Sequence, residues 1–91
     1  GNSAAASTTM TLTISSPTDG TTVTSASVVI KGKTRANAEV FVNDVETKAD
    51  ANGNFSVTLT LDEGDNPIVV SANDADGNVA EKELIVYYNA S

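Results

Sequence analysis

The sequence contains no cysteine, no histidine and no tryptophan. Because cysteine is absent, the chain can form no disulfide, no thiolate metal site and no cysteine nucleophile. Because histidine is absent, the commonest general base near neutral pH is missing as well. Serine and threonine are frequent, but they alternate with apolar residues at positions where strand propensity explains them without a catalytic role. We therefore predict that the chain is not an enzyme and has no catalytic residue.

Aromatic residues are also scarce, at 4% of the 91 residues. A core must then be built from many small aliphatic side chains and not from a few large ones. No apolar stretch approaches the ~18 residues that span a bilayer, so we expect no membrane insertion. No signal-peptide pattern is present, which leads us to expect a mature chain or an excised fragment.

Basic residues are outnumbered: five Lys and Arg stand against twelve Asp and Glu, for a net charge of −7. Such a field repels phosphate backbones and anionic lipid headgroups, which excludes nucleic acid as a partner. The simplest explanation of the excess of acidic residues is that they keep the protein soluble. It also suits a protein that works outside cells, so we expect an extracellular, secreted or cell-surface location.

Two five-residue passages nearly repeat each other, DANGN at residues 50–54 and DADGN at residues 74–78. Asn-Gly or Asp-Gly between alternating runs is a strong hairpin signal, because both turn residues tolerate positive φ. Two such turns in one small chain predict a β-meander.

Apolar and polar residues alternate with a period of two in short runs, separated by turn signals every 8–12 residues or so. This pattern predicts an all-β, immunoglobulin-like antiparallel β-sandwich of about seven strands in two stacked sheets. We expect residues 1–9 to be a flexible linker or an expression remnant, and residues 10–89 to form the sandwich domain. Gly32, in the middle of a run, predicts a bulge or a close approach of another segment. The inward-facing residues of the sandwich are expected to be Met10, Leu12, Ile14, Val23, Val28, Ile30, Val40, Val42, Phe55, Val57, Leu59, Leu61, Ile68, Val70, Ala72, Leu84, Val86 and Tyr88.

The order and spacing of several short motifs give the chain a family likeness. They are Ile14-x-Ser16-Pro17-Thr18-Asp19-Gly20, Val28-x-Ile30-x-Gly32-x-Thr34, Ala38-x-Val40-x-Val42-Asn43, Asp50-x-x-Gly53-x-Phe55, Gly64-x-Asn66-x-Ile68-x-Val70-x-Ala72-x-Asp74 and Gly77-Asn78. Together, over about residues 10–88, they resemble the bacterial immunoglobulin-like (Big-type) repeats of secreted enzymes, adhesins and surface-layer proteins. The resemblance implies a non-catalytic spacer, stalk or accessory module.

The acidic turns offer the one candidate ion site, with oxygen side chains at alternate positions. Calcium takes 6–8 oxygen ligands, and the EF-hand pattern places a Glu eleven positions after the first Asp. Those two positions hold Leu61 and Ile85. Asp and Asn also favour turns for backbone reasons, so we predict turn chemistry, no metal site and no cofactor. The alternative is a calcium ion at Asp50, Asn52 and Asn54 or at Asp74, Asp76 and Asn78.

Other candidate sites have ordinary explanations as well. A Lys–Asn isopeptide bond would draw on Lys31, Lys33 or Lys82 with Asn89, but these lysines fall on the polar stripe of their strands. The carboxylates of Asp62 and Glu63 stand in a turn, where we expect them to be solvated. Asn54 and Asn89 match glycosylation acceptors that matter only in a host that uses them.

Two aromatic rings are candidates for a carbohydrate-binding surface. Tyr87 is expected to point outward, and Phe41 lies opposite the Val40 and Val42 face. Packing across strands or against an adjacent repeat is the commoner role of such rings.

These observations predict a structural spacer module of a larger secreted or cell-surface protein. Its partners would be neighbouring domains of the parent chain. The alternative is an interaction module that binds polysaccharide or a surface protein through a sheet face or a loop end.

Overall fold

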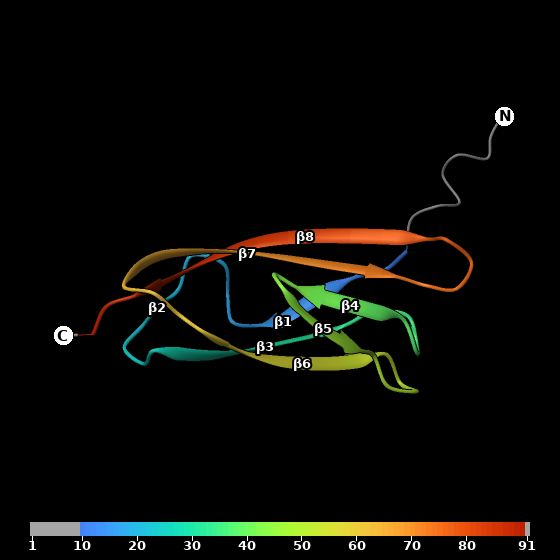
Figure 1. Ribbon diagram of the computed structural model, residues 1–91, viewed down its shortest axis with the longest axis horizontal. Helices are drawn as coiled ribbons and strands as arrows, with labels where there is room; N and C mark the ends of the chain where they lie inside the picture. Colours follow the sequence, from blue (N-terminus) through green and yellow to red (C-terminus); the bar gives the residue numbers. More distant parts are fainter. Residues whose placement is uncertain (1–9, 91) are drawn as a thin grey trace, which may run out of the picture.

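The computed structural model describes residues 10–90, and they form strands and turns without a helix. No segment among these residues is therefore a helix able to cross a membrane. The expected linker, residues 1–9, lies outside the described residues. The eight strands are β1 (Thr13–Ser16), β2 (Thr22–Val23), β3 (Ser27–Lys33), β4 (Glu39–Val42), β5 (Val45–Lys48), β6 (Asn54–Thr60), β7 (Gly64–Asn73) and β8 (Val79–Tyr88) (Figure 1).

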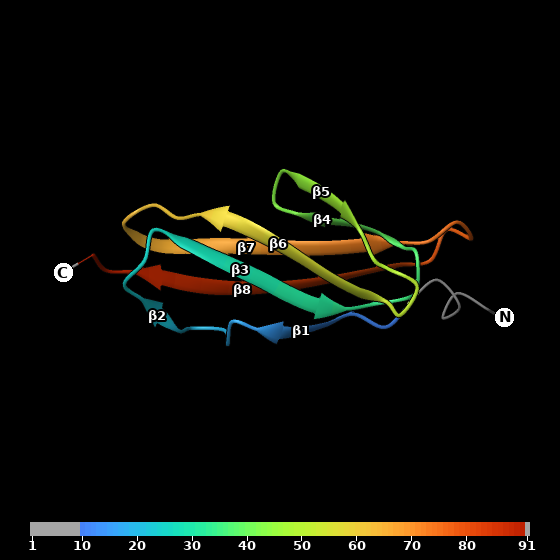
Figure 2. The same ribbon diagram turned by 90° about the horizontal axis from the view of Figure 1, so that it is seen from below.

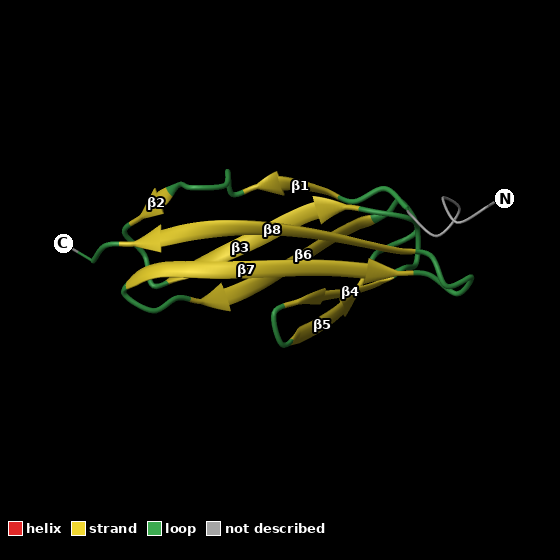
Figure 3. Cartoon of the chain, turned by 90° about the horizontal axis from the view of Figure 1, so that it is seen from above, coloured by secondary structure: helices red, strands yellow, loops and turns green. Residues whose placement is uncertain are grey.

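The strands form two stacked sheets, one with the order β1-β3-β6 and the other with the order β2-β8-β7-β4-β5. In Figure 3, β3 and β6 of the smaller sheet cross obliquely behind β7 and β8. The predicted all-β sandwich is confirmed, and its strand order is that of an immunoglobulin-like sandwich whose first strand is divided between the sheets. The eighth strand, β2, was not expected. It has two residues and pairs with β8 in parallel, the one parallel pair among the described strands.

The core lies between the two sheets and follows the period-two pattern of the sequence. Side chains of β6 alternate strictly between buried and exposed, and those of β4 do the same. Met10, Ile14, Val23, Val28 and Tyr88 are partly buried and pack against this core. The buried cluster itself consists of Leu12, Ile30, Val40, Val42, Ala49, Phe55, Val57, Leu59, Leu61, Ile68, Val70, Ala72, Leu84 and Val86. The expected inward stripes are thereby confirmed.

The predicted β-meander is wrong at the first of the two repeated turns. The turn at residues 74–78 closes a hairpin between β7 and β8, as expected. The turn at residues 50–54 instead carries the chain from β5 in the large sheet to β6 in the small one. In both turns only the glycine has a positive φ, +87° at Gly53 and +88° at Gly77. Each is a three-residue loop that ends in a left-handed glycine, and not a two-residue turn.

Gly32 is a point of close approach, as the sequence predicts. A Cβ atom at this position would meet the backbone oxygen of Thr13 and the ring of Phe55. The register of β1 against β3 also shifts between Ile14 and Ser16, directly beside this glycine. The missing side chain therefore lets β1 and the Phe55 ring pack tightly against β3.

The two ends of the described chain lie at opposite ends of the sandwich (Figure 1). The N-terminal end holds the β3–β4 loop and the turns at residues 50–54 and 74–78. The C-terminal end holds the β2–β3 and β6–β7 connections. A pull on both ends of the chain would thus act along the strands.

Candidate functional site

The two repeated turns use the same set of hydrogen bonds. In the first, Asp50 Oδ1 accepts the backbone N–H groups of Asn52 and Asn54, both at 2.9 Å. In the second, Asp74 Oδ1 accepts those of Asp76 at 3.0 Å and Asn78 at 2.9 Å. Each aspartate thus satisfies backbone donors that a tight turn leaves without a carbonyl partner. This is the turn chemistry that the sequence favoured over an ion site.

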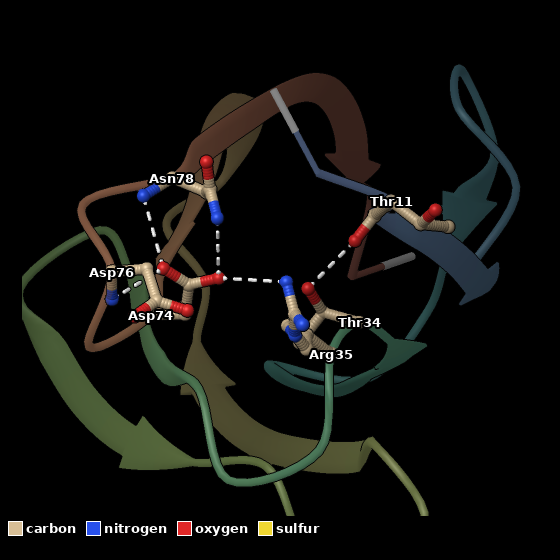
Figure 4. Close-up of polar contacts among 6 residues, drawn as sticks. All are labelled: Thr11, Thr34, Arg35, Asp74, Asp76 and Asn78. Atoms are coloured by element: carbon tan, nitrogen blue, oxygen red, sulfur yellow. Dashed lines mark hydrogen bonds and ion pairs between the residues drawn. The ribbon is translucent and has the colours of Figure 1, made fainter. Parts of the chain in front are cut away.

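Asp74 has two further partners that Asp50 lacks among the described contacts. Asn78 Nδ2 donates to Asp74 Oδ2 at 2.9 Å, and Arg35 Nη1 lies 3.2 Å from the same oxygen (Figure 4). The Asp74 side chain is 8% exposed, whereas that of Arg35 is 58% exposed. The side-chain hydrogen bond from Asn78 is the main cause that lowers the pKa of Asp74, with smaller contributions from the two backbone N–H groups and from Arg35. Partial burial opposes this shift.

Thr34, next to Arg35, ties the first segment of the chain to the same end of the sandwich. Its hydroxyl donates to the backbone oxygen of Thr11 at 2.7 Å (Figure 4). Thr34 is the buried polar residue of the described core, and its backbone N–H also donates to the oxygen of Gly53. The β3–β4 loop therefore connects the N-terminal segment, the turn at residues 50–54 and the turn at residues 74–78.

This polar cluster does not have the composition of a metal site. Within residues 10–90, no three Asp, Glu, His or Cys side chains come close enough together to hold an ion. The Asp74 carboxylate accepts hydrogen bonds from a guanidinium group and three N–H groups. These donors stabilise the carboxylate and occupy the oxygens that a cation would need. The carboxylates of Asp50 and Asp74 thus accept hydrogen bonds from their own turns.

A second candidate site lies on the outer face of the large sheet, near the β7–β8 turn. Phe41 on β4 is paired with Ser71 on β7, which is paired with Glu81 on β8. Together with Asn73 and Val79 they line a groove of about 510 Å³. Phe41 is 36% exposed and Val79 is 54% exposed. Asn73 Oδ1 is buried there and accepts no hydrogen bond from the described residues.

Tyr87 is exposed on the same face, as expected, but it does not extend this groove. It is paired with Asp65, and Phe41 is paired with Ser71, six residues further along β7. At about 3.3 Å per residue the two rings are separated by roughly 20 Å along the sheet. Phe41 and Tyr87 therefore do not form one continuous aromatic row.

The residues considered for an isopeptide bond are not brought together. Lys31 and Lys33 are exposed on the small sheet, and Lys82 is exposed on β8. Asn89 follows the end of β8, seven residues beyond Lys82, which is roughly 23 Å along an extended chain. The predicted polar stripe is correct for Lys31 and Lys33 but wrong for Lys82, which is paired with the inward-facing Val70 and so lies on the inner face of β8, although it is exposed.

The remaining sequence candidates lie at exposed positions. Asp62 and Glu63 are exposed between β6 and β7, and Glu63 Oε2 accepts the backbone N–H of Ala90 at 3.0 Å. The glycosylation acceptors Asn54 and Asn89 are also exposed. The pair Arg35–Asp74 and the buried Oδ1 atom of Asn73 were missed, because each depends on strand pairing between distant parts of the sequence.

Comparison with known proteins identifies the family. A family model described as glucodextranase, domain B, matches residues 10–90, so the chain belongs to this family. The family is a β-sandwich, non-catalytic accessory domain of a secreted glycoside hydrolase. The resemblance to an accessory module of a secreted protein is confirmed to that extent, although the match does not name a Big-type repeat. A search of curated proteins found no match to the chain.

Proposed function

We propose that this member of the glucodextranase domain B family is a non-catalytic spacer that carries tension within a larger secreted or cell-surface protein. The observation that supports it most directly is the pairing of a segment near the start of the chain with the last strand. The segment at residues 19–23 and the end of β8 run side by side in the same direction, and the chain ends leave at opposite poles (Figure 1).

Several hydrogen bonds link these two segments. Those between backbone groups include Gly20 N–H to Ile85 O at 2.7 Å, Tyr87 N–H to Thr21 O at 2.9 Å and Asn89 N–H to Val23 O at 2.9 Å. In addition, Ile85 N–H donates to Asp19 Oδ1 at 2.8 Å. Tension on the chain ends pulls the two segments past each other, so these bonds are loaded together and not one after another. We refer to residues 19–23 and 85–89 as the shear patch.

The test is single-molecule force spectroscopy on a tandem array of the domain, pulled through its ends. Asp19→Ala removes the acceptor for Ile85 N–H, and we expect it to lower the unfolding force. Asp44→Ala, at the exposed β4–β5 reversal and outside the shear patch, is the matched control and should leave the force unchanged. Equal unfolding forces for Asp19→Ala and the unaltered domain would contradict the proposed role of the patch.

A second candidate function is contact with a glucan at the Phe41 groove. It is favoured by the apolar ring beside Ser71, Asn73 and Glu81, since sugar recognition combines an apolar platform with a few polar groups. The name of the family refers to an enzyme of glucan breakdown. In this role the domain would hold the substrate of a catalytic domain elsewhere in the parent protein.

Affinity electrophoresis in gels containing dextran tests this second function. Dextran should retard the unaltered domain, and Phe41→Ala should abolish the retardation. Tyr87→Ala removes an equally exposed ring outside the groove, and this variant should migrate like the unaltered domain. Retardation that persists in Phe41→Ala, or that is absent from the unaltered domain, would dismiss the groove as a glucan site.

The proposed partners are the neighbouring domains of the parent chain, and the proposed location is outside the cell. The net charge of −7 supports neither nucleic-acid binding nor attachment to an anionic membrane.

A further inference from the structure

The free edge of β6 differs from the free edges of the other outer strands in the described fold. β6 is an outer strand of the small sheet, paired with β3 on one side only (Figure 2). It is seven residues long, with the sequence NFSVTLT. Its exposed residues, Asn54, Ser56, Thr58 and Thr60, carry no charge, and the strand contains no proline. Charges, prolines, bulges and short length are the usual means by which proteins prevent an edge from pairing.

The other outer strands use these means. β1 and β5 have four residues each, and β2 has two. β1 is also irregular where its register shifts between Ile14 and Ser16. β5 carries Glu46 and Lys48, and the part of β8 not covered by β2 carries Glu81, Lys82 and Glu83. β6 is therefore the one seven-residue outer strand among the described strands that carries none of these protections, and its first residues, Asn54–Ser56, share a groove with Thr47 and Lys48 of β5.

The hydrogen-bond pattern shows which backbone groups of β6 face outward. Thr34 N–H donates to Gly53 O, and Leu61 N–H donates to Ala26 O, at the two ends of the β3–β6 ladder. Both pairs fit the register in which Ile30 lies opposite Val57. In an antiparallel pair, alternate residues bond to the partner, so Phe55, Val57 and Leu59 bond to β3. The N–H and C=O groups of Ser56, Thr58 and Thr60 consequently point to the free edge.

We propose that this edge pairs with the same edge of a second copy of the chain, in antiparallel orientation, with a two-fold axis at Thr58. Thr58 then faces Thr58 of the second copy, and Ser56 faces its Thr60. About six backbone hydrogen bonds can form between the outward groups. The small sheets of the two copies become one continuous sheet. This inference does not depend on the spacer role or on glucan binding.

The side chains along the edge support a second copy as the occupant. In the proposed register, Thr58 faces Thr58 and Ser56 faces Thr60, so every pair consists of two hydroxyl residues. Such cross-strand pairs are favourable. Although each chain carries a net charge of −7, none of that charge stands on β6. At the same register, Asp62 of one copy faces the uncharged Asn54 of the other, in a groove lined by both Lys48 and Asp50.

Disulfide trapping is a sharp test, because the chain contains no cysteine of its own. Directly opposed residues in an antiparallel bonded pair have Cα atoms about 5.5 Å apart, which suits a disulfide. Under mild oxidation we expect Thr58→Cys to form a covalent dimer at least about tenfold faster than Thr13→Cys on β1, the other edge of the same sheet. Ser56→Cys and Thr60→Cys should each cross-link slowly alone and rapidly when mixed. Equal rates for Thr58→Cys and Thr13→Cys, or no preference for the mixture, would overturn the proposal.

Sedimentation equilibrium provides the measurement without cross-linking. The unaltered chain should shift with concentration from its mass of 9.3 kDa towards twice that value. Thr58→Lys places two like charges at the axis and should remove the shift, whereas Thr13→Lys should retain it. Circular dichroism checks that both variants keep their strands. A single mass of one chain across the range, or association that survives Thr58→Lys, would contradict the paired edge.

Discussion

Arg35 and Asp74 join two loops that are 39 residues apart in the sequence, with Nη1 of the arginine 3.2 Å from Oδ2 of the aspartate. The arginine belongs to the β3–β4 loop, which passes from the small sheet to the large one, and the aspartate begins the β7–β8 turn. Their contact holds together the N-terminal end of the sandwich. Because Arg35 is largely exposed, most of what stabilises Asp74 comes from the hydrogen bonds of its own turn.

Asp74 should make the stability of the domain depend on acid. Its pKa is lowered in the folded state, so its contribution is present above the pKa of an unfolded aspartate and is lost as the pH falls through the folded value. We expect Asp74→Asn to lower the free energy of unfolding at neutral pH, and the difference from the unaltered domain to shrink in acid. Urea denaturation between neutral and strongly acidic pH measures this. Asp76→Asn, in the same turn, should show no such convergence, and a pH-independent effect of Asp74→Asn would refute the argument.

Arg35→Ala should be milder than Asp74→Asn in the same denaturation experiment. The ion pair is partly exposed, so salt screens its attraction. The hydrogen bonds that the Asp74 carboxylate accepts within its turn are much less sensitive to salt. The destabilisation by Arg35→Ala should decrease between low and high salt. An effect as large as that of Asp74→Asn, or one that is insensitive to salt, would show that the ion pair dominates.

Gly53 and Gly77 occupy equivalent places in the repeated turns, yet they should respond differently to alanine. Both have positive φ, which costs an alanine about 1–2 kcal/mol. A Cβ at Gly77 meets nothing within 4 Å, whereas at Gly53 it would collide with the backbone oxygen of Thr34. We expect Gly77→Ala to cost about 1 kcal/mol and Gly53→Ala about 3 kcal/mol or more, as overpacking adds to the φ cost. Thermal and urea unfolding give both values, and similar costs at the two sites would contradict the difference in packing.

Thr34→Val should reveal how firmly the first segment is attached. Valine keeps the shape of threonine but leaves the oxygen of Thr11 without the hydroxyl donor that stands 2.7 Å away. A loss of about 1–3 kcal/mol is expected for a buried acceptor left unpaired. Hydrogen exchange should also become faster at the start of β1. Thr47→Val, on the edge strand β5, is the control, and an equal effect there would indicate a general cost of replacing a threonine hydroxyl instead of the loss of the bond to Thr11.

The alternation of apolar residues was sufficient to predict the sandwich, because burial between two sheets requires a period of two. It identified the buried positions of β6 and the inward face of β7. These features depend on residues that are close together in the sequence.

Features that depend on distant partners could not be predicted in the same way. The turns at residues 50–54 and 74–78 have matching hydrogen bonds, but one crosses between sheets and the other stays within a sheet. The difference arises because β4 pairs with β7, which takes β5 to the outer edge of the large sheet and leaves β6 to pair with β3. β2 has only two residues and no pattern to reveal it. The contact of Arg35 with Asp74 and the burial of Asn73 Oδ1 depend on the same long-range pairing.

The separation of the chain ends has a consequence for protein engineering. In many domains the termini are close together, so circular permutation needs only a short connection. Here a connection from residue 90 back to residue 10 would have to run past the whole of β8, which is ten residues long, or roughly 33 Å. Insertion of the domain into a host loop would force that loop open by a similar distance, whereas fusion in series requires no such detour.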